Sequence, residues 1–189
     1  MRLVLLFSLL LAAPASAQRF GLAAGANFGS LSDAQAADLS TSTGYHVGAF
    51  AGLAVGTVGV RGSVLYLHAG DATFVCPDGQ ACTDQLEEVA VDVISVPVDL
   101  QLRLPLAVAA VYLGAGPDLR FPINDGQPVF DTRSVNVAAT GLIGAEFSNV
   151  FVELRYAHDV TGYANQINAV DSDPDYKLNT VMLRAGIGI

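Results

Sequence analysis

The hydrophobic positions of this chain alternate with polar ones in short segments from about residue 18 onward. The segment 94–104 is the clearest, with Ile, Val or Leu at every even position and Ser, Pro, Asp, Gln or Arg at every odd one. Because successive side chains of a β-strand point to opposite faces, this pattern predicts a strand with one apolar and one polar face. Seven further segments follow it more loosely. The sequence therefore predicts eight strands of about 9–11 residues, the length that crosses a bilayer when tilted.

The connections between these segments alternate between short and long. The short ones are Gly56-Thr57, Pro105-Leu106-Ala107 and Ser148-Asn149, and the long ones run from Leu31 to Thr43, Gly70 to Glu88, Phe121 to Arg133 and Val160 to Tyr176. Bacterial outer-membrane barrels have short periplasmic turns and long external loops. We therefore predict an all-β fold, an eight-stranded antiparallel up-and-down transmembrane β-barrel in the outer membrane, with lipid as its immediate partner.

The first seventeen residues have the pattern of a secretory signal peptide. Arg2 supplies the positive charge, Leu3 to Ala13 form the apolar segment, and Ala15-Ser16-Ala17 has the small-x-small form of a cleavage site. A membrane-anchor helix is disfavoured because the apolar run is short and ends at Pro14. We expect a signal peptide over 1–17 and a barrel domain over 18–189.

On this prediction the polar faces of the strands line the interior of the barrel. The charged residues on those faces are Arg61, Asp99, Arg103, Asp118, Arg120, Glu146, Glu153, Arg155 and Arg184. Side chains can fill the interior of an eight-stranded barrel, and an unpaired charge inside it would be costly. We expect the charges to pair with one another. The alternative is a charged channel or proton path.

The long connections carry most of the acidic residues of a chain whose net charge is −9. The basic surface of a nucleic-acid-binding protein is absent. Asp171, Asp173 and Asp175 form the densest acidic run and are weak candidates for Ca²⁺, since the pattern lacks the Gly and distal Glu of an EF-hand. Cys76 and Cys82 flank a tight turn in the second long connection, and in an exported protein this spacing predicts a disulfide.

Three histidines, His46, His68 and His158, fall near the long-loop ends of predicted strands. His68 near Asp71 and His158 beside Asp159 are the nearest candidates for a lipid-modifying site. Histidines at loop ends are more often simply solvated, and no G-x-S-x-G nucleophile motif is present. We expect no enzymatic activity and no cofactor.

Several short motifs resemble a known family. They are Gly21 to Phe28 (G-x-x-x-G-x-N-F), Ile94 to Val98, Leu113 to Pro117, Gly144 to Glu146, and Val152 to Tyr156. Together they resemble the PorT-like "porin family" of small outer-membrane barrels, and the resemblance covers essentially the whole mature chain. It implies an eight-stranded barrel, in a family whose members mostly have no assigned activity. The chain ends on Ile189, where such barrels usually have an aromatic residue.

The leading functional hypothesis is therefore a non-enzymatic envelope protein that is structural or presents its loops to other envelope proteins. A narrow ion or small-solute channel is the first alternative. An outer-membrane lipid enzyme is the second, and a soluble lipocalin-like barrel is the third. The charged interior and the apolar outer faces disfavour the soluble barrel.

Overall fold

The computed structural model describes residues 18–32, 42–72, 89–123, 135–161 and 177–189. The predicted signal peptide, Cys76, Cys82 and the acidic run Asp171, Asp173 and Asp175 lie outside these ranges. Among the described residues, none belongs to a helix of the length and hydropathy that a membrane span requires.

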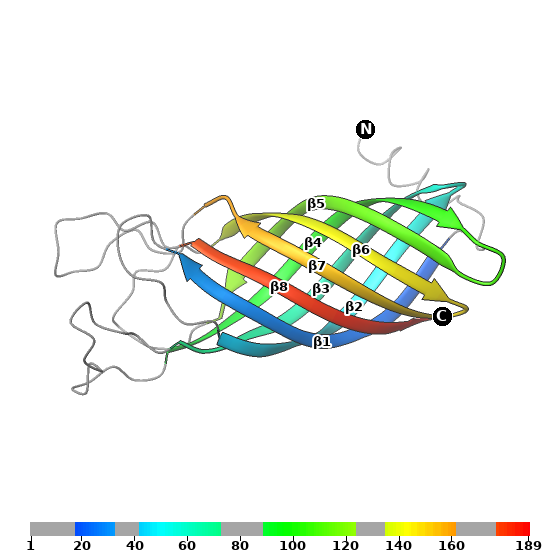
Figure 1. Ribbon diagram of the computed structural model, residues 1–189. Coiled ribbons are helices and arrows are strands. Elements are labelled where there is room, and N and C mark those ends of the chain that lie inside the picture. The colour runs from blue at the N-terminus through cyan, green and yellow to red at the C-terminus, as the bar shows by residue number, and fades with distance from the viewer. Residues whose placement is uncertain (1–17, 33–41, 73–88, 124–134, 162–176) are drawn as a thin grey trace, which may run out of the picture.

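Eight antiparallel strands form a closed barrel in which each strand pairs with its neighbours in chain order, as predicted (Figure 1). The strands are β1 (Gln18–Ser32), β2 (Ser42–Val55), β3 (Val58–Ala72), β4 (Val89–Pro105), β5 (Ala110–Pro122), β6 (Asn136–Phe147), β7 (Val150–Asp159) and β8 (Lys177–Gly188). The first and last strands close the barrel, with Leu22 opposite Ile187. No strand edge is therefore left unpaired, as a bilayer requires.

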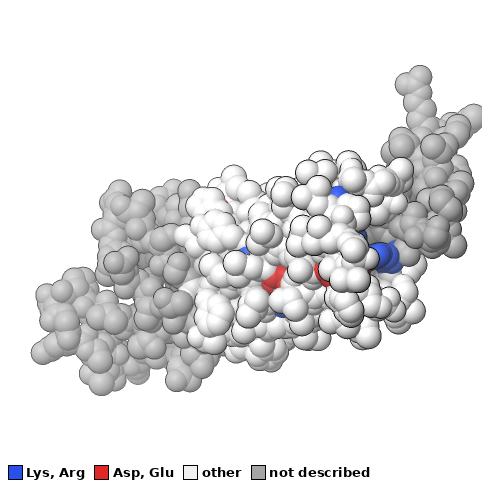
Figure 2. Space-filling model, turned by 45° about the vertical axis from the view of Figure 1, so that its right-hand side comes forward, with Lys and Arg blue, Asp and Glu red and all other residues white. Residues whose placement is uncertain are grey.

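The alternation predicted for each strand is the one observed. Apolar side chains such as Leu100, Ile143 and Leu154 are exposed on the outside, whereas polar ones such as Asp99 and Arg155 are buried inside. The described outer surface is accordingly almost free of charge in the view of Figure 2. Tyr45 and Tyr66 lie near the long-loop end with ring centres 6.2 Å apart, where an amphipathic ring suits the membrane interface.

Seven of the eight strands are longer than predicted, at 12 to 17 residues, and β7 has 10. Beyond the hydrocarbon layer the outward side chains need not be apolar, so the alternation fades while pairing continues; Ala72 still pairs with Val89. The second short turn, predicted at Pro105-Leu106-Ala107, begins one residue later because β4 continues to Pro105. The amide of Leu106 closes this turn by donating to the carbonyl of Ala109 at 2.7 Å.

Pro97 and Pro117 lie within β4 and β5, and a proline inside a strand usually marks a bulge or a local break. The pairing of β4 with β5 is interrupted between Pro97–Asp118 and Leu100–Ala115, but the register is the same on both sides. The prolines therefore remove ladder hydrogen bonds without shifting the strands. The register shift between β3 and β4 lies elsewhere, between His68 and Asp71.

Candidate functional site: the charged lumen

The centre of the lumen is occupied by a layer of five charged side chains. Arg61 lies on β3, Asp99 on β4, Glu153 and Arg155 on β7, and Arg184 on β8. The register places Arg61 opposite Asp99 and Glu153 opposite Arg184. All five residues occupy inward-facing positions of their strands. The alternation that makes the outside apolar therefore also brings these charges together inside. We call them the central layer.

Two ion pairs of the central layer, Arg155–Asp99 and Arg61–Glu153, cross the lumen. Arg155 donates from Nη1 and Nη2 to the two carboxylate oxygens of Asp99, at 3.0 and 2.5 Å. Arg61 pairs closely with Glu153 and lies 3.9 Å from Asp99. Such bidentate, charge-assisted contacts are the strongest kind of protein hydrogen bond.

Glu153 is the hub of the central layer. Besides Arg61, it receives Arg155 Nη2 at 3.4 Å and Arg184 Nη2 at 2.7 Å. The Arg184 contact is an ion pair by distance but lacks hydrogen-bond direction. The neutral groups contribute as well, since the Gln101 amide oxygen can accept from Nε and Nη2 of Arg61 at 3.0 Å each, and Thr140 donates to Asp99 at 3.2 Å.

A second cluster lies toward the long-loop end. Arg120 donates from Nε to Asp118 at 3.0 Å and from Nη1 to Asp159 at 2.8 Å, and all three side chains are buried. The hydroxyl of Ser95 donates to Asp118 at 2.7 Å. Asp159, which the sequence suggests only as a neighbour of His158, belongs to this cluster.

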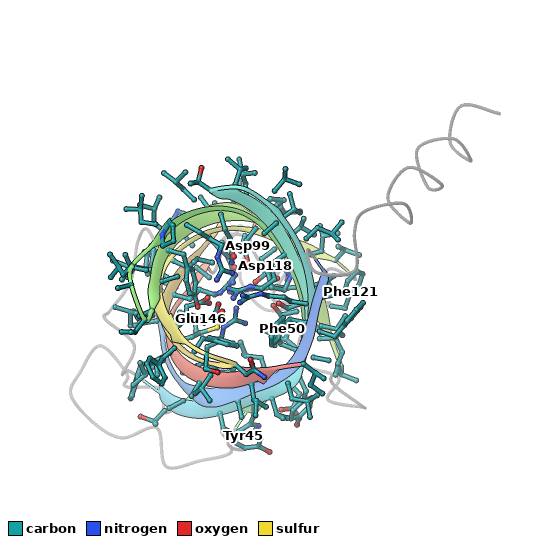
Figure 3. All side chains as sticks on the ribbon, turned by 90° about the vertical axis from the view of Figure 1, so that its right-hand side faces the viewer. Tyr45, Phe50, Asp99, Asp118, Phe121 and Glu146 are labelled. Carbon is teal, nitrogen blue, oxygen red and sulfur yellow. The ribbon has the colours of Figure 1, made fainter. Side chains whose placement is uncertain are left out.

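A third cluster lies at the short-turn end. Arg103 donates from Nη2 to Glu146 at 2.8 Å, and Arg19 also pairs with Glu146. Figure 3, viewed from this end, shows Glu146 inside the barrel with Asp99 and Asp118, whereas Tyr45 and Phe121 point outward. Sequence reasoning missed Arg19, which is the second residue of β1 and has the inward parity of that strand.

His158 does not form the acid–base pair considered from the sequence, and His68 contacts a different carboxylate from the one considered. His158 and Asp159 are adjacent in β7 and so point to opposite faces: His158 is exposed and donates to Asn179 Oδ1 at 2.6 Å, while Asp159 is buried. His68 pairs with Asp92, at 2.7 Å, and the side chain of Asp71 lies outside the described part. In the described ranges, no three His, Cys, Asp or Glu side chains are grouped as metal ligands.

His46 differs from the expectation of a solvated loop-end histidine. Its side chain is fully buried inside the barrel, and neither ring nitrogen has a hydrogen-bond partner among the described residues. The even-numbered residues of β2, such as Phe50, face the interior of the barrel, and His46 is one of them.

A closed eight-stranded barrel with an apolar exterior and an ion-paired lumen defines a class, the small outer-membrane β-barrels. The chain belongs to the outer membrane protein beta-barrel domain family, whose sequence profile matches residues 3–188. Membership of this family places the protein in the bacterial outer membrane. The profile does not separate PorT-like barrels from other members.

Two solved structures are similar to this chain, and the one with the higher TM-score supports the fold. Neisserial surface protein A (NspA) is 15% identical with a TM-score of 0.50, covering 89% of this chain and 96% of that one. The attachment invasion locus protein Ail of Yersinia pestis, solved with the heparin analogue sucrose octasulfate, is 17% identical with a TM-score of 0.46, covering 92% and 99%. No curated protein sequence matches the chain.

Proposed function

We propose that this protein is a closed, non-enzymatic outer-membrane barrel that anchors its long connections for contacts with other envelope components. Within the family, the short motifs noted above favour the PorT-like type. The observation that carries the proposal is the central layer, because its ion pairs join opposite walls of the barrel.

The geometry of the central layer disfavours passage of solutes. In a closed barrel of eight strands in chain order, β3 lies opposite β7, and β4 is separated from β7 by two strands. The Arg61–Glu153 and Arg155–Asp99 pairs therefore bridge the lumen, and these side chains are almost completely buried. A solute would have to break such pairs, and breaking one buried pair costs about 3–5 kcal/mol. A barrel blocked in this way is suited to anchoring rather than transport.

The blocked lumen is tested by conductance in planar bilayers. The wild-type barrel is expected to give no discrete steps, whereas the Asp99→Ala/Arg155→Ala double variant removes one bridge without changing the net charge and is expected to give them. Discrete wild-type steps whose ion selectivity changes in Glu153→Gln would support the channel hypothesis and refute the proposal.

Display of the long connections is tested on intact cells. An epitope tag inserted in the segment 73–88 is expected to bind antibody without permeabilisation, whereas a tag in the Ser148-Asn149 turn is expected to need it. The opposite result would refute the outward orientation of the long connections. Loss of lipid turnover in His68→Ala or His158→Ala would instead identify the lipid enzyme.

A further inference from the structure

The short-turn end of the lumen contains a cavity of about 310 Å³. Its charged lining residues are Arg19, Arg61, Arg103 and Glu146, and the rings of Phe50, Tyr112 and Phe151 also line it. Figure 3 shows the labelled Glu146 and Phe50 pointing into this end of the barrel. Arg61 belongs to the central layer, so the ion-paired central layer lies at the inner end of the cavity.

The charge of this cavity is opposite to that of the chain. Three of the nine Lys and Arg residues line it, but only one of the eighteen Asp and Glu residues does, with the main-chain carboxylate of Ile189 as a second anion, in a protein of net charge −9. Arg19 and Arg103 share the single carboxylate of Glu146. Behind them, Arg61, Arg155 and Arg184 share the carboxylates of Asp99 and Glu153.

The long-loop end has the reverse balance. There Arg120 faces two carboxylates, those of Asp118 and Asp159. Positive charge in the described lumen is therefore concentrated toward the cavity. The guanidinium of Arg103 and the carboxylate of Glu146 are mostly shielded, with 15% and 12% of their side chains exposed. A surplus cation at low solvent exposure attracts a compensating anion strongly.

Aromatic rings stand beside these cations. The guanidinium carbon of Arg61 lies 5.5 Å from the ring centres of Tyr112 and Phe151, and that of Arg103 lies 5.9 Å from Tyr112. Phe50 meets Phe151 edge to face with ring centres 5.4 Å apart. Ligand sites typically combine such apolar walls with a few charged groups, and this cavity is at the small end of their range of about 300–1,000 Å³.

We propose that this cavity binds a small organic anion from the periplasmic side: a carboxylate or phosphate group on an apolar body of about one ring. The anionic group lies between Arg19 and Arg103, where it competes with Glu146, because a guanidinium pairs with either oxyanion. The apolar body packs against Phe50, Tyr112 and Phe151. This site goes beyond the proposed anchoring role and does not depend on it.

Isothermal titration of the folded barrel in zwitterionic detergent tests the site, with benzoate and phenyl phosphate as probes and neutral benzamide as the matched control. At least one anion is expected to bind saturably with one site per barrel, and benzamide at least about tenfold more weakly, since it lacks the charge. A preference between the two anions identifies the chemical class. The absence of saturation for both, or equal binding of benzamide, overturns the proposal.

Two substitutions with opposite expected signs separate binding from folding. Arg19→Gln should weaken binding about threefold, as expected for a half-exposed cation, and Glu146→Gln should strengthen it about threefold by removing the competing carboxylate. Asp92→Asn, at the other end of the barrel, should leave affinity unchanged. Should Glu146→Gln not fold, Arg19→Glu must abolish binding. Equal affinity in wild type and Arg19→Gln, or weaker binding in a folded Glu146→Gln, overturns the proposal.

Discussion

Replacement of Glu153 by Gln is the most direct test of how the lumen stabilises the barrel. The side chain of Glu153 is completely shielded from solvent and lies within ion-pair distance of Arg61, Arg155 and Arg184. Gln keeps the volume and removes the charge. Any loss of stability then reports on electrostatics rather than on a cavity.

The size of the expected stability loss depends on which carboxylate each arginine still contacts in Glu153→Gln. Arg155 retains Asp99 at 2.5 Å and Arg61 retains it at 3.9 Å. Arg184, in contrast, has Glu153 as its ion-pair partner in the described lumen. Leaving a buried charge uncompensated costs about 3–5 kcal/mol. We expect Glu153→Gln to lower the free energy of unfolding by about 4 kcal/mol.

The assay is urea unfolding of the barrel in lipid vesicles, followed by the mobility of unheated samples on gels and extrapolated linearly to water. Glu146→Gln is the matched control, because its carboxylate pairs with the half-exposed Arg19 near the mouth of the lumen; its loss should be about 1 kcal/mol. Adding Arg184→Met to Glu153→Gln should recover part of the loss by removing the orphaned cation. Equal losses in Glu153→Gln and Glu146→Gln would refute this reasoning.

Three further substitutions test other parts of the structure by the same unfolding measurement. Ile143→Arg places a charge on the lipid face of β6, where the Ile side chain is 61% exposed. It should lower the free energy of unfolding by about 2–4 kcal/mol, and a decrease below about 1 kcal/mol would contradict the lipid-facing assignment. Gly144→Ala should lower the free energy of unfolding by about 1–3 kcal/mol, because a Cβ there would overlap the ring of Tyr112. Adding Tyr112→Leu, which replaces the ring by a smaller side chain, should recover this loss, and no recovery would contradict the overlap. His46→Leu should leave stability unchanged or raise it, since both ring nitrogens lack partners among the described residues; a clear loss would show that a polar group outside that set satisfies them.

The fold could be predicted because the two sides of each strand face different media. Lipid selects Val98, Leu100 and Leu102 on one face of β4, and the polar lumen selects Asp99 and Gln101 on the other, so the period of two is easily recognised. The strand ends could not be predicted as well. Outside the hydrocarbon layer both faces meet water, and backbone pairing leaves no signature in the side chains.

The composition of the lumen could be predicted, but its pairing could not. The alternation along each strand is enough to place Arg61 and Glu153 inside the barrel. Their contact, however, joins β3 to β7 across the lumen, and it depends on strand register and tilt. Arg19 and Asp159 were missed because each lies at the edge of its strand. Extending the alternation by one residue in β1 and by three residues in β7 would have found both.

The charged lumen also has a consequence for strand register. If β7 slipped by one residue, Glu153 and Arg155 would face lipid, where an Arg near the membrane midplane costs about 2–4 kcal/mol, and Asp99 would lose its partner on β7. With an apolar lumen both faces of β7 would suit lipid and the slip would cost far less. The hypothesis is that the ion pairs specify one register rather than add net stability. Replacing all five residues of the central layer with Leu or Met should then preserve the free energy of unfolding but give more than one set of amide resonances for β7, and a single set would refute it.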